Sequence, residues 1–276
     1  MVWVIIIIVF IIIFFIFGYV SNYLLVSSEY ETDPGEKTSY HRFVHLSDLH
    51  CLLHGRDNER LIRMIDEAKP EFIVISGDLV TKHLRNDSRK VLSALGLLKE
   101  LAGRYPVYYA PGNHEIRLYD YEGFKEILSE TGVIYLDNKK IDLPDNISIY
   151  GLELPIEWFR GKKELKSDDV AEYLGEKSPD RSKYNILLAH DPCRFDAYAE
   201  WGADLTLSGH LHGGILRLPL LGGVISPYMK LFPKYDAGLY EKNGHIMIVS
   251  RGLGTHHIRL RWFNRPEIIS ISLRKH

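Results

Sequence analysis

An uncharged apolar run opens the chain and restricts what its first residues can form. From Val2 to Val20 the sequence reads VWVIIIIVFIIIFFIFGYV, without a charged side chain. This is about the length of 20 residues that an α-helix needs to cross the hydrocarbon of a bilayer. A cleaved signal peptide would show a basic start, a shorter apolar stretch and a small-residue cleavage site, and none is clear here. We therefore predict an uncleaved transmembrane anchor over residues 1–25.

The segment that follows, residues 26–41, is polar and contains Pro34 and Gly35. This composition predicts a linker, which could reach about 50 Å when fully extended at roughly 3.3 Å per residue. The flank carries more acidic than basic residues, and a flank without basic excess is easier to translocate. We predict a single-pass protein of the cell membrane whose domain, residues 42–276, lies outside the cytoplasm.

The composition of the whole chain fits one globular domain with a sizeable core. Of its 276 residues, 46% are hydrophobic and 25% are charged, and the formal net charge is −2. That balance is ordinary for a globular protein. We see no run of lysine and arginine interleaved with aromatic residues, so we expect no nucleic-acid partner.

Two kinds of strand pattern indicate an α/β chain. Buried strands are predicted at 42–47, 71–76, 106–110 and 184–189, with helices at 57–68, 87–101 and 120–130. Runs that alternate more strictly, at 147–153, 245–250 and 267–274, predict a second and more antiparallel sheet.

Polar side chains follow several of these strands. They are Asp48, His50, Asp78, Asn113, His114, His190, His210 and His212. Each residue alone is weak evidence for a functional site, because Asp and Asn are common in turns. Together they predict one site, since ligands of open α/β sheets bind at the carboxyl ends of strands. Oxygen and imidazole ligands without thiolates suit Mn²⁺, Fe or Zn²⁺ and argue against a structural zinc site.

The order of these motifs, DLH, GD, GNHE, a strand-ending histidine and GHLH, resembles the calcineurin-like metallophosphoesterase family. The resemblance implies a four-layer α/β/β/α sandwich of two mixed sheets and a metal-dependent hydrolase of phosphoric ester bonds. The later motifs GHLHGG, KYDAGLY, VSRGLG and NRPEI resemble a membrane-anchored bacterial branch that includes UDP-2,3-diacylglucosamine hydrolases. Ile215 departs from that branch, which usually has glutamine there.

The family pattern implies two divalent transition-metal ions and a role for each motif residue. Asp48, His50 and His212 would hold one metal. Asn113, His190 and His210 would hold the other, and Asp78 would bridge the two. His114 has no metal in this pattern and would protonate or stabilise the departing oxygen.

The predicted substrate is a phosphodiester or pyrophosphate, in a lipid-linked or envelope molecule. A broad phosphomonoesterase or a protein phosphatase is the alternative among enzymes. A non-catalytic scaffold of the same fold is the alternative outside enzymes, and the intact ligand set argues against it.

Three further features carry predictions. Cys51 and Cys193 should lie near the same end of the sheet, either as free thiols or as a disulfide. The pair His256 and His257 follows a glycine turn near the mouth of the site. The stretch 215–232 predicts a loop, either with an apolar surface whose Arg217, Lys230 and Lys234 meet anionic headgroups, or packed as core over the second sheet.

Overall fold

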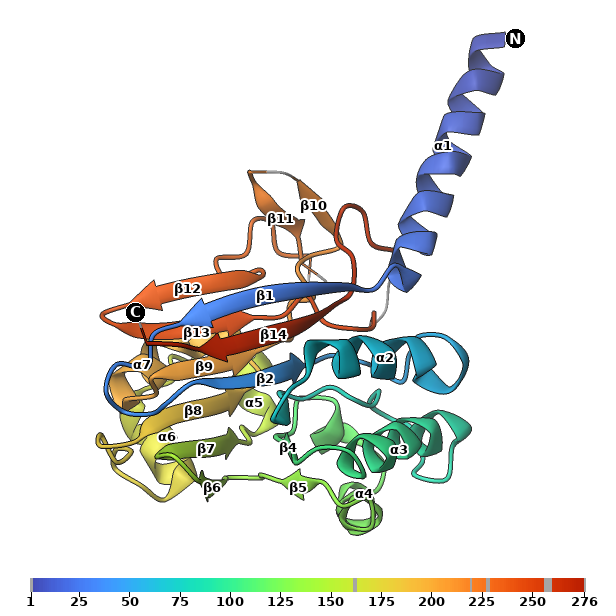
Figure 1. Ribbon diagram of the computed structural model, residues 1–276. Helices are drawn as coiled ribbons and strands as arrows, with labels where there is room; N and C mark the ends of the chain where they lie inside the picture. The colour runs from blue at the N-terminus through green and yellow to red at the C-terminus, as the bar shows by residue number, and fades with distance from the viewer. Residues whose placement is uncertain (1, 161–162, 219, 227–228, 256–259, 276) are drawn as a thin grey trace.

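The computed structural model describes residues 2–160, 163–218, 220–226, 229–255 and 260–275 (Figure 1). Two six-stranded sheets pack face to face. The first has the order β1-β14-β2-β3-β4-β5, and its strands are β1 Val26–Thr32, β14 Glu267–Leu273, β2 His41–Leu46, β3 Phe72–Ile75, β4 Val107–Tyr109 and β5 Ile134–Tyr135. The second has the order β12-β13-β9-β8-β7-β6, and its strands are β12 Gly238–Lys242, β13 His245–Val249, β9 Leu205–Ser208, β8 Tyr184–Ala189, β7 Ile147–Leu152 and β6 Lys139–Leu143.

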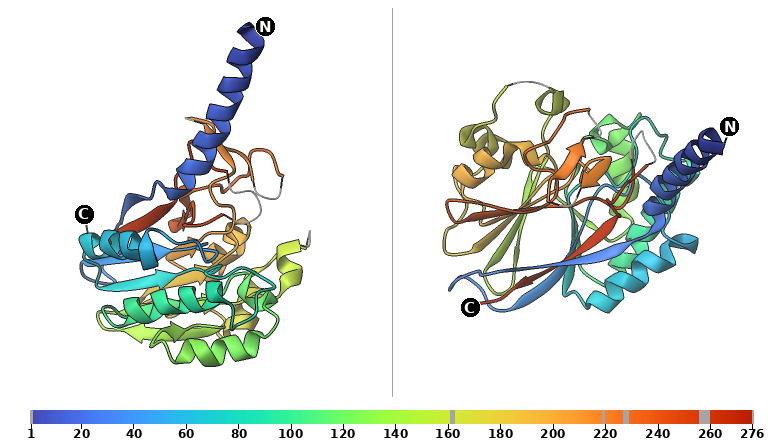
Figure 2. Two further views of the ribbon diagram at one scale, coloured as in Figure 1. Left: turned by 90° about the vertical axis from the view of Figure 1, so that its right-hand side faces the viewer. Right: turned by 90° about the horizontal axis from the view of Figure 1, so that it is seen from above.

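Helices cover the outer faces of both sheets, as Figure 2 shows from above. The helices on the first sheet are α2 Glu59–Ala68, α3 Arg89–Ala102 and α4 Tyr121–Ser129. Those beside the second are α5 Ile156–Arg160, α6 Ser167–Leu174 and α7 Phe195–Trp201. Separate apolar clusters fill the space between α2 to α4 and the first sheet, between the two sheets, and between the second sheet and its helices. The predicted four-layer sandwich of two mixed sheets is confirmed.

The second sheet is less antiparallel than predicted. Its four central strands, β7, β8, β9 and β13, are parallel to one another. The edge strands β6 and β12 each pair antiparallel with their neighbour. Strand β14, predicted for the second sheet, lies in the first, antiparallel to β2. The alternation of apolar and polar residues in β14 led to the wrong sheet, because its polar residues find partners within the first sheet and beside it. Ser270 accepts a hydrogen bond from Arg42, and Glu267 pairs with Arg251.

The predicted linker over residues 26–41 is wrong in its first half. Residues 26–32 form β1, which pairs parallel with β14 from Val26↔Glu267 to Thr32↔Leu273. The polar residues Ser27, Glu29 and Glu31 alternate along the exposed face of this strand. Pairing with β1 satisfies the backbone of β14, which would otherwise be an open sheet edge. Residues 33–40 lie outside regular strands and helices.

The predicted loop 215–232 contains a short antiparallel hairpin, so the expectation of no regular element is wrong. Its strands are β10 Leu216–Leu218 and β11 Gly222–Ile225. Leu220, Leu221 and Phe232 are exposed rather than packed as core over the second sheet. The apolar surface predicted for this stretch is therefore confirmed.

The N-terminal helix α1, Val2–Val20, is long and apolar enough to cross a membrane by length and composition. Its C-terminal turns contact the body directly. The Trp262 ring stacks on Phe14 with centroids 4.8 Å apart, and its Nε1 donates to the Phe14 carbonyl at 2.9 Å. The Arg261 amide donates to the Gly18 carbonyl at 2.9 Å. The helix is therefore held by the segment that contains Arg261 and Trp262, and it continues within a few residues into β1 of the first sheet.

Gly18 provides a test of this docking. A Cβ at Gly18 would lie 2.6 Å from the Trp262 ring, whereas a Cβ at Gly96 in α3 would meet open space. We expect Gly96→Ala to raise the free energy of unfolding by about 0.5–1 kcal/mol through helix propensity. Gly18→Ala should lower the Tm instead, because the ring must move. Thermal unfolding of the full chain in nanodiscs makes the comparison, and an equal gain for both variants would contradict the docked arrangement.

Candidate metal centre

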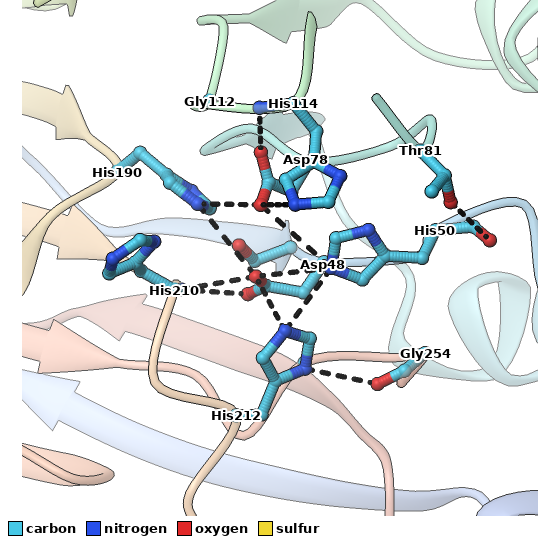
Figure 3. A network of polar contacts seen from close by, with 12 residues as sticks. Asp48, His50, Asp78, Thr81, Gly112, His114, His190, His210, His212 and Gly254 are labelled. Atoms are coloured by element: carbon cyan, nitrogen blue, oxygen red, sulfur yellow. Dashed lines mark hydrogen bonds and ion pairs between the residues drawn. The ribbon is translucent and has the colours of Figure 1, made fainter. Parts of the chain in front are cut away.

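The predicted site residues meet where strands of both sheets end (Figure 3). The first sheet supplies Asp48 and His50 after β2, Asp78 after β3, and Asn113 and His114 after β4. The second sheet supplies His190 after β8 and His210 and His212 after β9. All of these residues are buried. The structure thus brings the aspartates and histidines of the strand-end pattern together in overlapping groups of possible metal ligands.

The loops that carry these residues have unusual backbone conformations. Positive φ angles occur at Asp48 (54°), His50 (48°), Asp78 (53°), His210 (73°) and His212 (52°). Such angles cost about 1–3 kcal/mol each for residues with a side chain and persist only where the surroundings impose them. Here the amides of Asp48 and His50 donate to the carbonyls of Gly77 and Asp78, each at 3.0 Å. These hydrogen bonds lock the first two loops against each other.

One cluster of ligand-type atoms comprises Asp48, His50 and His212. The Nε2 atoms of His50 and His212 lie 3.1 Å apart, and His212 Nε2 lies 3.5 Å from Asp48 Oδ1. The Nδ1 atom of His212 lies 3.1 Å from the Gly254 carbonyl, to which it donates when it carries the ring proton. That bond fixes the ring with its Nε2 lone pair directed at the cluster.

A second cluster comprises Asp78, His190 and His210. His190 Nε2 lies 3.1 Å from Asp78 Oδ2, and its Nδ1 lies 2.7 Å from the Ser76 carbonyl. Donation from Nδ1 to that carbonyl again turns Nε2 inward. Asp78 also approaches the first cluster, with its Oδ2 3.8 Å from His50 Nε2. Its carboxylate therefore lies between the two groups.

The chemistry of the donors fits bound cations. Burial raises the pKa values of Asp48 and Asp78, and the neighbouring Asp48 carboxylate adds to the shift of Asp78. Burial alone would lower the pKa of His190, yet Asp78 and Asp48 raise it to about 10. The carboxylates thus impose a field that attracts positive charge. Asn113 Oδ1 is buried without a hydrogen-bond partner among the described residues, as expected for an oxygen that binds a metal.

His114 differs from the other histidines in its hydrogen bonding. Its Nδ1 accepts a hydrogen bond from the Lys82 amide at 2.9 Å. In the neutral ring the proton then resides on Nε2, which lies 3.9 Å from Asp78 Oδ2. The His114 amide also donates to Asp78 Oδ1 at 2.8 Å, which fixes the residue beside that carboxylate. His114 thus presents a donor to the centre.

Glu115, for which the sequence indicated no role, holds the loops of the site together through hydrogen bonds to their backbone. Its carboxylate is fully buried and accepts from the amides of Asp78 at 2.9 Å, Gly112 at 2.8 Å and Val80 at 3.1 Å. Burial raises the pKa of Glu115, with a further contribution from Asp78, while the hydrogen bonds from the Val80 and Gly112 amides oppose the shift. Its place at the end of GNHE was visible in the sequence, but two of its three partners, Asp78 and Val80, lie in another loop.

Other predicted features have different outcomes. Cys51 and Cys193 are free thiols. Arg217, predicted to meet anionic headgroups, instead pairs with Asp236 at 2.6 Å. The pair His256 and His257 lies outside the described residues.

Two buried carboxylates, surrounded by histidines at the strand ends of a two-sheet sandwich, form a site for metal ions of the kind that metal-dependent hydrolases use. Residues 41–214 match the family described as calcineurin-like phosphoesterase, and the chain belongs to that family. It is a metal-dependent hydrolase of phosphoric ester bonds.

Several curated relatives share most of the described domain. The metallophosphoesterase YkuE of Bacillus subtilis is 30% identical over 84% of this chain and 76% of its own length. A transmembrane protein with metallophosphoesterase domain from Danio rerio is 30% identical over 85% of this chain, which spans about half of that relative (53%). The phosphodiesterase YaeI of Escherichia coli is 27% identical over 75% of this chain and 72% of its own length.

Glu115→Gln tests the support beneath the centre. The amide nitrogen of glutamine would face backbone N–H groups that now donate to a carboxylate, so one or more donors would lose their acceptor. We expect affinity for Mn²⁺ to fall about 10–100-fold, as is typical when outer-shell partners of a metal site are changed. Calorimetric titration measures the change, with the exposed Glu130→Gln as control. Unchanged affinity in Glu115→Gln would exclude this supporting role.

Proposed function

We propose that this protein is a dinuclear metal-dependent hydrolase of phosphodiester or pyrophosphate bonds in a lipid-linked or envelope substrate. The observation that carries the dinuclear part is that Asp78 belongs to two of three overlapping groups of possible ligands: one with His190 and His210, and one with His114 and His50, which is also in the first cluster. A carboxylate has two oxygens and can serve two cations at once, which a lone histidine cannot.

In this proposal Asp48, His50 and His212 hold one ion, and Asn113, His190 and His210 hold the other. The oxygen and imidazole donors suit Mn²⁺, Fe or Zn²⁺. When bound, two such ions would activate water and neutralise charge on phosphoryl oxygens. The protein holds the donors rigidly, through the carbonyls that orient His190 and His212 and through Glu115 behind Asp78.

His114 acts as proton donor to the leaving oxygen. Its Nε2 carries the proton because Nδ1 accepts from the Lys82 amide. The ring is 4.6 Å from that of His50, centroid to centroid, so the donor lies beside the first cluster. Phosphoryl transfer requires mainly positioning and charge stabilisation from a protein, and protonation of the leaving oxygen complements both.

Three observations support the choice of substrate. The relative from Escherichia coli is named a phosphodiesterase. The apolar helix α1 docks on the body, so the centre stays close to any bilayer that the helix enters. Phe159 of α5 places an apolar ring 5.4 Å from the His210 ring, next to the donors of the second cluster. An apolar wall suits a substrate with an acyl or other apolar group.

The proposed topology has residues 1–25 as a single membrane anchor, with the domain outside the cytoplasm. The acidic residues of β1, Glu29 and Glu31, are exposed and lie directly after the helix. A flank without basic excess favours translocation.

Asp78→Ala tests the dinuclear centre. Removing the shared carboxylate should abolish activity and reduce the bound metal, because both clusters lose a donor. Metal content and turnover of the full chain are measured together, with the exposed Asp168→Ala as control. Full activity of a metal-free Asp78→Ala protein would overturn the dinuclear mechanism in favour of a different chemistry, whereas a wild-type protein that binds no metal and has no activity would support the scaffold alternative.

His114→Ala separates proton donation from metal binding. We expect both metals to remain bound and turnover to fall about 10²–10⁴-fold, the usual contribution of a general acid. The loss should be larger for an alkoxide leaving group than for p-nitrophenolate, which departs without a proton. The exposed His83→Ala serves as control, and equal losses for both leaving groups would contradict the donor role.

The substrate class is tested by comparing aryl phosphomonoesters, aryl phosphodiesters and nucleoside-diphosphate lipids with the Mn²⁺-loaded protein. We expect the diesters or the pyrophosphate-linked lipids to have the highest kcat/KM. A strong preference for monoesters would favour the alternative of a broad phosphomonoesterase.

A further inference from the structure

An exposed apolar surface lies on the side of the body from which α1 emerges. We call it the apolar rim, and its residues are Leu220, Leu221, Met229, Leu231, Phe232 and Phe263. Each is at least 59% exposed, and Leu220 is fully exposed. Single exposed apolar residues are ordinary, but a group of this kind marks an interaction site.

The rim is built on ordered structure. Strands β10 and β11 pair antiparallel, and a bridge between Ile225 and Leu231 brings the following segment alongside β11. The base of the hairpin is held by buried Asp236, which accepts hydrogen bonds from Arg217 at 2.6 Å and from Tyr240 at 2.7 Å. The hairpin therefore presents its apolar residues in fixed positions.

The hairpin is continuous with the segment that holds α1. Leu216 of β10 forms a parallel bridge with Trp262, and the Arg217 amide donates to the Trp262 carbonyl at 3.0 Å. The Trp262 ring in turn stacks on Phe14, within the apolar run of α1. Helix, Trp262 segment and hairpin thus form one connected unit. Figures 1 and 2 show the hairpin rising beside the lower part of α1.

These contacts indicate how deep the rim lies. Tyr19 near the end of α1 and Tyr23 in the 3₁₀ turn that follows it are exposed, and their hydroxyls lie 3.3 Å apart. Tyrosines of this kind are enriched at the interface between membrane and water. Trp262 binds α1 at Phe14, one to two turns further into the apolar run than Tyr19. Whatever bilayer α1 crosses must then meet Trp262 and the hairpin beside it.

We propose that the apolar rim inserts into the interfacial layer of the same bilayer that α1 crosses, as a second membrane contact beside the anchor. The occupant is a lipid surface. Lys230 and Lys234 are exposed next to the rim and suit anionic headgroups. Arg217 does not contribute, because Asp236 holds it. Burial of apolar side chains supplies the attraction, and the two lysines add a dependence on lipid charge.

The rim also brings the metal centre to the membrane surface. Only Gly213, Gly214 and Ile215 separate His212 from β10. The contact would therefore hold the centre close to a phosphate that is carried by a lipid headgroup. This consequence rests on the proposed function, whereas the membrane contact itself does not.

Depth-dependent quenching tests the contact on the full chain in nanodiscs that contain anionic lipid. Leu220→Cys carries an environment-sensitive fluorophore, in a chain whose Cys51 and Cys193 are replaced by serine. Leu92→Cys is the matched control, because Leu92 is also an exposed leucine (51%) but lies on α3. We expect blue-shifted emission at position 220 and quenching by shallow doxyl lipids several-fold stronger than at position 92.

Equal quenching at the two positions would overturn the proposal. A fluorophore at position 220 that is shielded but not quenched, and only in nanodiscs holding two chains, would assign the rim to contact between copies and also overturn it.

A second variant separates this inference from the proposed function. Leu220→Ser combined with Leu221→Ser should slow hydrolysis of a lipid-borne phosphoester at least several-fold, with hydrolysis of a soluble aryl phosphoester unchanged. Leu92→Ser is the control. Quenching at position 220 without any hydrolysis of the lipid-borne ester would keep the membrane contact and reject the lipid-linked substrate.

Discussion

The burial of two neighbouring carboxylates is the constraint on which the rest of the centre depends. Asp48 and Asp78 are 0% and 2% exposed, and ionised carboxylates in such a place require positive charge or many donors. Space around them is so limited that a Cβ at Gly209 would lie 2.1 Å from Asp48 and one at Gly112 would lie 2.3 Å from Asp78. Glycine at these two motif positions is therefore a packing requirement of the carboxylates themselves.

The same constraint explains which residues each of the two sheets contributes to the centre. The first sheet supplies both carboxylates, and the second supplies three histidines that face them, His190, His210 and His212. Neither sheet alone has a balanced site: the first would bury both carboxylates without the three histidines that face them, and the second would contribute imidazoles without a carboxylate. Asp48 Oδ1 lies 3.8 Å from His190 Nε2 and 3.5 Å from His212 Nε2, so the centre connects the strand ends of the two sheets.

The sequence predicted the centre better than it predicted the sheets. Ligand positions were readable because strand ends combine a local signal, a buried β-branched run, with polar residues that a turn alone does not need. Sheet membership was not readable for β14, since Ile/Ser alternation does not distinguish a solvated face from one satisfied by Arg42. The polar segment after α1 was misassigned for a related reason, because the exposed face of an edge strand has the composition of a linker. The supporting role of Glu115 was not predicted, because its hydrogen bond to the Asp78 amide joins segments that are far apart in the chain.

Arg261 connects α1 to the centre and so fixes how the two are oriented relative to each other. Arg261 is buried, and although burial lowers its pKa to about 10 it remains charged at neutral pH. Its amide binds the Gly18 carbonyl of α1, while its guanidinium donates to the Gly254 carbonyl that also orients His212. Arg261 thus links α1 to His212 of the centre through successive hydrogen bonds. A flexible tether would let the body rotate freely relative to α1, whereas this connection fixes the direction of the centre relative to the helix.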